Sequence, residues 1–319
     1  MAFTIAASQA VGTVANPAYS GVFIPEIWST KLIQKFYDAT VLAAISNTDY
    51  QGEIKNQGDK VIIRTKPTIT IRDYENGQAL TVERPSSNVV ELLIDKGKYW
   101  NTILDDVMET QMDINMMSKW AEDASEQLKI AIDTQVLAAL GAGVASANKG
   151  AAAGRISANL ALGTSTVPVQ ITSSNVIDKI IDMGQVLDEQ NIPETGRWVV
   201  IPSWMASRIK KSDLKDASLS GDNQTPLRNG RLGMIDRFTL YTSNLLPSAS
   251  TGGGGTPAST TRWGIYAGHS HGFTFAAQIA KTETMRSELT FGQLMRGLSV
   301  YGYKVVDGTA LVEMYAYPG

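Results

Sequence analysis

The sequence predicts an α+β fold, and three observations lead to this prediction. A long amphipathic helix is expected over residues 113–141, a strand–helix unit follows at residues 197–212, and residues 262–317 are mainly strand-like. Segments with helical and strand periodicities that occupy different parts of a chain favour an α+β arrangement over an alternating βαβ one. The following paragraphs justify these elements and then ask what chemistry they carry.

Bulk composition defines the class of protein. The chain has 319 residues, 43% of them hydrophobic and 18% charged, which is typical of a globular protein with a large core. A net charge of −3 argues against tight binding of nucleic acid by charge neutralisation. The absence of Cys excludes disulfides, thiol catalysis and Cys-ligated metal sites. The sequence contains neither a secretory signal nor an apolar run of membrane-spanning length, so we expect no membrane partner.

The N-terminal part divides into an arm and a helix. Residues 1–22 are uncharged and rich in Ala, Ser, Gly and Thr, so they bury little by themselves. Two interpretations remain open: an arm that lies on a partner, or a frayed terminus. Pro25 then begins a predicted helix that ends before Asn47, since proline is tolerated in the first helical turn.

Residues 52–100 predict a long two-stranded hairpin. Strand patterns occur at residues 60–66, 68–72 and 89–94, with the turn dipeptide Asn76-Gly77 between them. Charged side chains of both signs are denser here than elsewhere, and the tip has little core of its own. Mixed charges suit a contact across a neighbouring subunit, but a solvated hairpin is an equally open interpretation. The candidate inter-subunit contact residues are Lys66, Arg72, Asp73, Glu75 and Arg84.

The helix at residues 113–141 is the longest predicted element. Asp113 is a potential N-cap, and Gly141 is expected to end the helix in a left-handed conformation. The predicted core stripe of this helix consists of Met117, Trp120, Ala124, Leu128 and Ile132. The periodicity alone does not separate an ordinary core helix from a spine that carries other layers. Within one subunit, we expect the stripe to pack against the C-terminal strands.

The middle of the chain predicts a separate subdomain. After an irregular segment at residues 142–171, Ser174 is a predicted N-cap of a second amphipathic helix that stops before Pro193. Residues 197–201 predict a buried strand, and Ser203 is the predicted cap of a third helix. A further strand is expected at residues 237–243, and aromatic-rich and β-branched strands follow the low-complexity loop near residue 250.

No motif in the sequence supports catalysis or cofactor binding. The glycines at residues 252–255 are not followed by the Lys-Ser/Thr of a phosphate-binding loop. His269 and His271 are the only histidines, and no nearby carboxylate completes a metal site. Neighbouring acidic pairs such as Asp105 and Asp106 are more typical of solvated faces than of acid–base catalysts. We therefore predict a non-enzyme without metal or cofactor.

The order of these parts resembles the HK97-like major capsid protein of tailed double-stranded DNA bacteriophages. The resemblance rests on FIPEIWSTKLIQKF, ELLIDKGKYWNTILDDVMETQMDI, IDTQVLAAL, RWVVIPSWMASRIKKS, LGMIDRFTLYTSNLLP and GLSVYGYKVVDGTALVEMYAY in this order. It implies this division: residues 1–22 N-terminal arm, 23–51 N-terminal helix region, 52–100 extended loop (E-loop), 101–171 peripheral domain with the spine helix, 172–246 axial domain, and 247–319 C-terminal strands returning to the axial and peripheral domains.

The resemblance also implies a function and partners. The protein would self-assemble into pentamers and hexamers of an icosahedral shell that encloses phage genomic DNA without sequence-specific binding. It would be assembled in the host bacterial cytoplasm, would reside in the virion capsid, and would have scaffolding and portal proteins as partners. Because the sequence starts at the arm, any scaffold is expected to be a separate or removed segment. The alternatives are an encapsulin-like protein compartment and, from another class, a soluble α/β enzyme.

Overall fold

A computed structural model describes most of the chain. It covers residues 10–11, 14–15, 37–38, 40–49, 60–65, 67, 69–85, 89–111, 116–212, 233–251, 260–288 and 290–319. The chain separates into two units, residues 1–36 and 37–319. In the first unit, strands β1 (Ala10–Val11) and β2 (Val14–Ala15) pair antiparallel, with Ala10 opposite Ala15. All other described elements belong to the second unit.

The long helix α4 spans Met116–Gly143. Its predicted cap, Asp113, lies outside the described residues. Its predicted end was wrong, because the helix continues through Gly141 for two further residues. Gly141 serves close packing instead: a Cβ atom at this position would collide with the Glu313 carboxylate of the last strand. Glycine is therefore needed at position 141 because the last strand packs closely against the helix there, and not because the helix ends.

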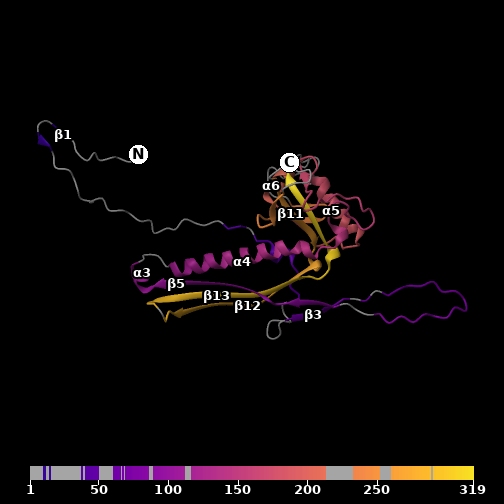
Figure 1. The fold of residues 1–319 in the computed structure, drawn as a ribbon, viewed down its shortest axis with the longest axis horizontal. Helices are drawn as coiled ribbons and strands as arrows, with labels where there is room; N and C mark the ends of the chain where they lie inside the picture. Colours follow the sequence, from indigo (N-terminus) through magenta and orange to yellow (C-terminus); the bar gives the residue numbers. More distant parts are fainter. Residues whose placement is uncertain are drawn as a thin grey trace. The chain divides into compact units, whose positions relative to one another are not determined.

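A three-stranded antiparallel sheet lies along α4 (Figure 1). Its order is β12 (Phe273–Arg286), β13 (Gly292–Val305) and β5 (Lys96–Asp105), and the short helix α3 (Asp106–Gln111) continues from β5. Exposed and less exposed residues alternate along β5, as expected for a sheet with one covered face. One face of this sheet packs on α4, and the other carries exposed side chains.

The second sheet has seven strands and contains both parallel and antiparallel pairs. Its order is β6 (Val169–Ile171), β14 (Leu311–Pro318), β11 (Thr260–His269), β7 (Arg197–Ile201), β9 (Phe238–Thr242) and β8 (Met234–Ile235), with β10 (Ser248–Thr251) paired to β11. The C-terminal third is thus shared between the two sheets, since β11 and β14 join this one and β12 and β13 join the other.

Strand β7 separates two hydrophobic cores, and all five of its residues are buried. Val199 and Ile201 face the core formed with helices α5 (Val176–Glu189) and α6 (Ser203–Lys211). Trp198 and Val200 face the core that contains the C-terminal end of α4. Burial on both faces explains why the sequence of this strand is a continuous apolar run and not an alternating one.

The structure corrects two predictions about where helices begin in this region. Helix α5 begins after Asn175, so Ser174 is not its N-cap. The Ser174 hydroxyl pairs instead with that of Thr172 at 2.9 Å, and the Asn175 side chain accepts a hydrogen bond from the Thr172 N–H at 2.7 Å. Ser203 is the first residue of α6, and Pro202 occupies the N-cap position. Among the described connections are the 3₁₀ turns η1 (Ser146–Asn148), η3 (Ser270–Gly272) and η4 (Gly308–Ala310).

Strands β3 (Lys60–Arg64) and β4 (Val89–Leu93) form the base of the predicted hairpin. The strand predicted at residues 68–72 is wrong for the part that is described, since residues 69–72 have no strand assignment. The turn is confirmed: the Gln78 N–H donates to the Glu75 carbonyl at 3.0 Å, and Gly77 has a φ of 87° that favours glycine. Within the predicted E-loop (residues 52–100), we refer to its described residues 67 and 69–85 as the extended loop.

Helix α1 (Leu42–Ile45) ends before Asn47, as predicted. The helix predicted from Pro25 is wrong for residues 37, 38, 40 and 41, which have no helical assignment, and its earlier part lies outside the described residues. Asp133 of α4 anchors this short helix, because its carboxylate accepts the Val41 N–H at 2.7 Å and the Leu42 N–H at 3.3 Å. Burial raises the pKa of Asp133 against the lowering effect of these two hydrogen bonds. The side chain thus takes the place of a local N-cap, which α1 lacks.

Candidate inter-subunit surfaces

The predicted contact residues lie on or beside the extended loop. Arg72 faces Glu83 across the loop at 3.9 Å, and the Thr70 hydroxyl donates to the Glu83 carboxylate at 3.4 Å. Glu75 lies in the turn, and Asp73 and Arg84 are exposed. Lys66 lies outside the described residues. The structure therefore places four of the five candidates on one exposed segment, but it contains no second copy that tests their contacts.

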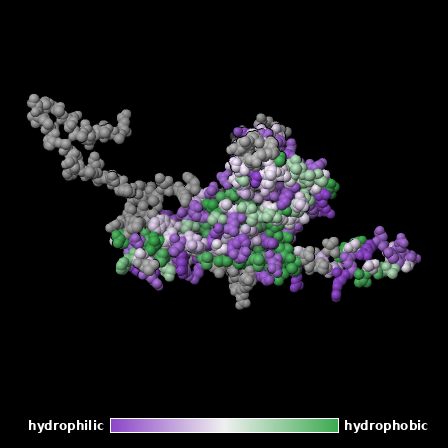
Figure 2. Space-filling view, viewed as in Figure 1, coloured by the Kyte–Doolittle hydropathy of each residue, from purple (hydrophilic) through white to green (hydrophobic). Residues whose placement is uncertain are grey.

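The same loop exposes apolar side chains that the sequence analysis did not single out. The exposed fractions are 62% for Ile69, 89% for Ile71, 78% for Leu80 and 93% for Val82. These residues alternate with Thr70, Arg72, Thr81 and Glu83, and side chains alternate between the two sides of an extended chain. Figure 2 shows hydrophobic and hydrophilic residues intermixed along this segment. The alternating TITIR pattern was the available signal, but it predicted a strand and not exposure.

The open face of the three-stranded sheet is a second exposed surface. Tyr99, Ile103, Met285 and Leu298 are between 43% and 80% exposed there. Their register explains the grouping, since Leu298 pairs with Tyr99 on one side and with Lys281 on the other. This surface combines apolar residues with a charged network.

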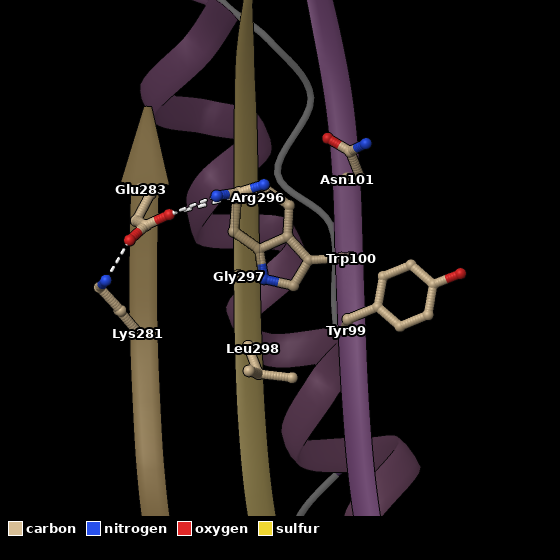
Figure 3. Close-up of a pocket in the computed structure, with 8 residues that line it drawn as sticks. All are labelled: Tyr99, Trp100, Asn101, Lys281, Glu283, Arg296, Gly297 and Leu298. Atoms are coloured by element: carbon tan, nitrogen blue, oxygen red, sulfur yellow. Dashed lines mark hydrogen bonds and ion pairs between the residues drawn. The ribbon is translucent and has the colours of Figure 1, made fainter. Parts of the chain in front are cut away.

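That network centres on Glu283 (Figure 3). Its carboxylate accepts hydrogen bonds from the Arg296 guanidinium at 2.8 Å and forms an ion pair with Lys281. The interactions with Lys281 and Arg296 lower the pKa of Glu283 to about 2, so the carboxylate is charged at neutral pH. A hollow of about 530 Å³ adjoins it, where the Trp100 indole crosses Gly297 and leaves no space for a Cβ atom. The lining places one carboxylate between two cationic side chains, Lys281 and Arg296.

A third exposed surface lies where the turn between β12 and β13 meets α3. Phe291 is 84% exposed and Val107 is 65% exposed. The segment is held in place because the Asp106 N–H donates to the Phe291 carbonyl at 3.2 Å and the Asp106 carboxylate pairs with Arg286. Large apolar side chains on a fixed backbone are typical of contact sites.

The predicted core stripe of α4 is partly buried. Met117, Trp120, Ala124, Leu128 and Ile132 all have intermediate exposure. The fully buried residues of this helix lie nearer its C-terminal end, at Val136, Leu137 and Leu140. The spine role of the stripe remains a prediction, because the structure shows only its packing within one chain.

The two histidines lie at the end of β11 and in the turn that follows it. His269 ends β11, and its Nδ1 accepts the His271 N–H at 3.1 Å in the following turn. Across the part of the chain that the structure describes, no three His, Asp or Glu side chains gather as metal ligands would. Within that same part, no helix is both long enough and apolar enough to cross a membrane.

Comparisons with known proteins agree on one relationship. A sequence profile for the phage capsid protein family matches residues 92–314. The structure of Mycobacterium phage Che8 is similar at 27% identity with a TM-score of 0.74, covering 92% of this chain and 97% of that one. The capsid structure of cyanophage P-SCSP1u follows at 14% identity and a TM-score of 0.70, covering 93% of each chain.

The asymmetric unit of the mature capsid of bacteriophage PhiM1 has 15% identity and a TM-score of 0.65, covering 92% of this chain and 91% of that one. At these low identities the second and third similarities show the fold alone. They confirm the predicted HK97-like α+β fold. A comparison with curated protein sequences found no match.

Proposed function

This chain belongs to the phage capsid protein family and is a major capsid shell protein, and we propose that its copies form pentamers and hexamers joined through the extended loop. One observation carries the proposal. The loop exposes Ile69, Ile71, Leu80 and Val82 by 62% or more, and a monomer gains nothing from this exposure. Contacts that repeat head to tail between copies close into rings, which then tile a shell.

The chemistry of the loop supports a contact with another copy. On one side, four apolar side chains can be removed from water, at about 25 cal/mol per Å² of apolar surface. On the other side, Arg72 is paired with Glu83 at 3.9 Å, and both side chains are more than one-third exposed. Such charges contribute little stability within one chain but can select the partner and its register.

The division of the chain supports the same proposal. We assign residues 1–22 to the arm, 52–100 to the E-loop, 101–171 to the peripheral domain and 172–246 to the axial domain. Residues 247–319 would then serve both domains, as the sharing of the C-terminal strands between two sheets suggests. Helix α4 would link the two domains.

The location in the virion capsid suggests where the protein assembles and with which partners. We propose a non-enzymatic protein that assembles in the host cytoplasm with scaffolding and portal proteins, and whose shell encloses double-stranded DNA. The net charge of −3 supports an inner wall that does not trap DNA. An encapsulin-like compartment is not favoured, because the matched family is that of phage capsid proteins. A soluble enzyme has no support from the described side chains.

Negative-stain electron microscopy of the expressed full chain tests the proposal. We expect closed particles or ring-shaped capsomers from the wild type and their loss in Val82→Asp. Thr81→Asp is the matched control, because it adds the same charge one residue away on the opposite side of the loop. Folded Val82→Asp protein that assembles as well as Thr81→Asp would contradict the role of the apolar side.

A further inference from the structure

A small pocket lies where the C-terminal end of α4 meets the seven-stranded sheet. It has a volume of about 170 Å³ and is bounded by Ala138 and Gly141 of α4, by Arg262 and Tyr266 of β11, and by Glu313 and Tyr315 of β14. This volume is enough for a partly hydrated ion, since one water molecule occupies about 30 Å³ in the liquid. The helix contributes only small side chains here, which is why the space exists.

Glu313 is the central group of the pocket. It is only 3% exposed, and it lies on the α4 side of β14 while its neighbours Val312 and Met314 face the opposite core. Its Oε1 atom has no hydrogen-bond partner among the described residues. A buried carboxylate oxygen without a partner is costly, so such an atom requires an explanation.

Two tyrosines interact with the Glu313 carboxylate and retain their protons. Burial, together with the charge of Glu313, raises the pKa of Tyr266 far above its ordinary value. The same causes raise the pKa of Tyr315 to about 12. Both hydroxyls therefore keep a proton that can be donated to Glu313 at neutral pH. Each hydroxyl oxygen carries two lone pairs, and the Tyr266 oxygen also accepts from the Gly141 N–H.

The resident cations near the pocket are engaged elsewhere. The Lys149 ammonium donates to the Gly141 carbonyl at 3.1 Å. The Arg262 guanidinium lies over the Tyr315 ring, 5.5 Å from its centroid, and donates to the Ser165 carbonyl. These contacts place neither cation in an ion pair with Glu313, whose Oε1 has no partner among the described groups.

We propose that this pocket binds a small monovalent cation, K⁺ or Na⁺, through Glu313 Oε1 and the neighbouring tyrosine oxygens. One carboxylate and neutral oxygens provide too little negative charge for a divalent ion, which prefers several carboxylates. The C-terminal end of α4 adds the negative end of the helix dipole. A cation here would join α4 to β11 and β14, and so would stiffen the junction between the helix and the seven-stranded sheet.

Thermal unfolding of the full chain tests this site. The probes are KCl, NaCl and choline chloride at equal ionic strength, with light scattering used to confirm the same assembly state in each. A cation present at about ten times its Kd should raise the Tm by on the order of 3 °C over choline. MgCl₂ and CaCl₂ at matched ionic strength should give no larger rise than the monovalent salts.

Two variants locate the effect. Glu313→Gln keeps the shape but removes the charge, and the difference between K⁺ and choline should disappear. Ala138→Leu fills the pocket from an exposed helix position, so it tests the site even when Glu313→Gln fails to fold. The matched control is Glu283→Gln, which removes a carboxylate on the other sheet and should retain the full cation effect.

Direct localisation completes the test. Thallium(I) replaces K⁺, and an anomalous peak beside Glu313 Oε1 is expected in crystals of the protein. Equal Tm values in choline and K⁺, or a cation effect that survives both Glu313→Gln and Ala138→Leu, would overturn the proposal. So would a basic side chain of a second copy occupying the pocket in assembled shells. Particles that fail to form in every salt would contradict the proposed function but not this site.

Discussion

Strand β7 and the extended loop contain similar residues in opposite environments. Val199 and Val200 of β7 are fully buried, whereas Ile71 and Val82 of the loop are 89% and 93% exposed. The strand has packing partners within the chain on both of its faces, and the loop has none among the described residues. β-branched residues therefore indicate extended structure in both regions. Whether they form a folding core or an assembly contact depends on whether the segment that covers them belongs to the same subunit or to another one.

The strongest test places the same charge in both regions. Val199→Asp should prevent folding, because an unpaired carboxylate between two cores costs more than about 4 kcal/mol. Val82→Asp should change the free energy of unfolding by no more than about 0.5 kcal/mol, since its side chain is already in water. Circular dichroism and thermal melts measure both. A folded Val199→Asp protein would contradict the described core.

A smaller effect is expected from a pair of glycines. Gly141→Ala should lower the free energy of unfolding by about 1–3 kcal/mol, because its Cβ would overlap the Glu313 carboxylate. Gly77→Ala strains a turn with a φ of 87° but meets no atom within 4 Å, so the core should melt as in the wild type. Urea denaturation compares the two, and equal losses would show that the loop and the core unfold as one unit.

Reversing the charge of an arginine on the extended loop tests its role in assembly separately from its role in folding. Arg72→Glu and Arg84→Glu should each reduce particle yield about tenfold, equivalent to about 1.4 kcal/mol per contact, while the subunit still folds. Electron microscopy and sedimentation measure the yield. Normal particles from both variants would reject the role of these charges.

The double variant Arg72→Glu with Glu83→Arg is the control for this prediction. It restores an ion pair within the loop but reverses its polarity toward a neighbour. If assembly recovers fully in the double variant, the charges act only inside the loop, and an inter-subunit role of Arg72 is wrong.

The smallest effect concerns Glu189, which fixes residues 155–158 to α5. Burial acts to raise its pKa, but the N–H groups of Ile156 and Ser157 outweigh this and lower it to about 2. A lowered folded-state pKa gives stability that is present above about pH 4.5 and is lost as the pH falls toward 2. Glu189→Gln should therefore cost about 1 kcal/mol at pH 7 and less at pH 2.

Urea denaturation at several pH values checks this prediction. Glu288→Gln serves as the control, because Glu288 is an exposed carboxylate outside this network. An equal pH dependence of the Glu189→Gln variant and the wild type would show that other carboxylates account for acid sensitivity.

Much of the fold was predictable because local signals were strong. The residues of β7 were assigned correctly from an apolar run, and Asn76-Gly77 was correctly identified as a turn. The errors have different causes: the helix continues through Gly141, which packs against Glu313 of a distant strand, whereas Asn175 takes the N-cap position beside Ser174, and the alternating residues 69–72 have no strand assignment. The apolar side of the extended loop was missed because exposure depends on which segments pack against it.

The sequence by itself determined the class of the molecule. Helix and strand patterns predicted a mixed α and β fold, and the absence of Cys and catalytic motifs gave no support to an enzyme; the phage capsid family followed from the resemblance of the ordered segments. Only the tertiary structure decided that the C-terminal strands serve two sheets, and that Glu313 lies buried opposite Gly141. Periodicity is a local property of a chain, whereas burial and pairing depend on residues far apart in sequence.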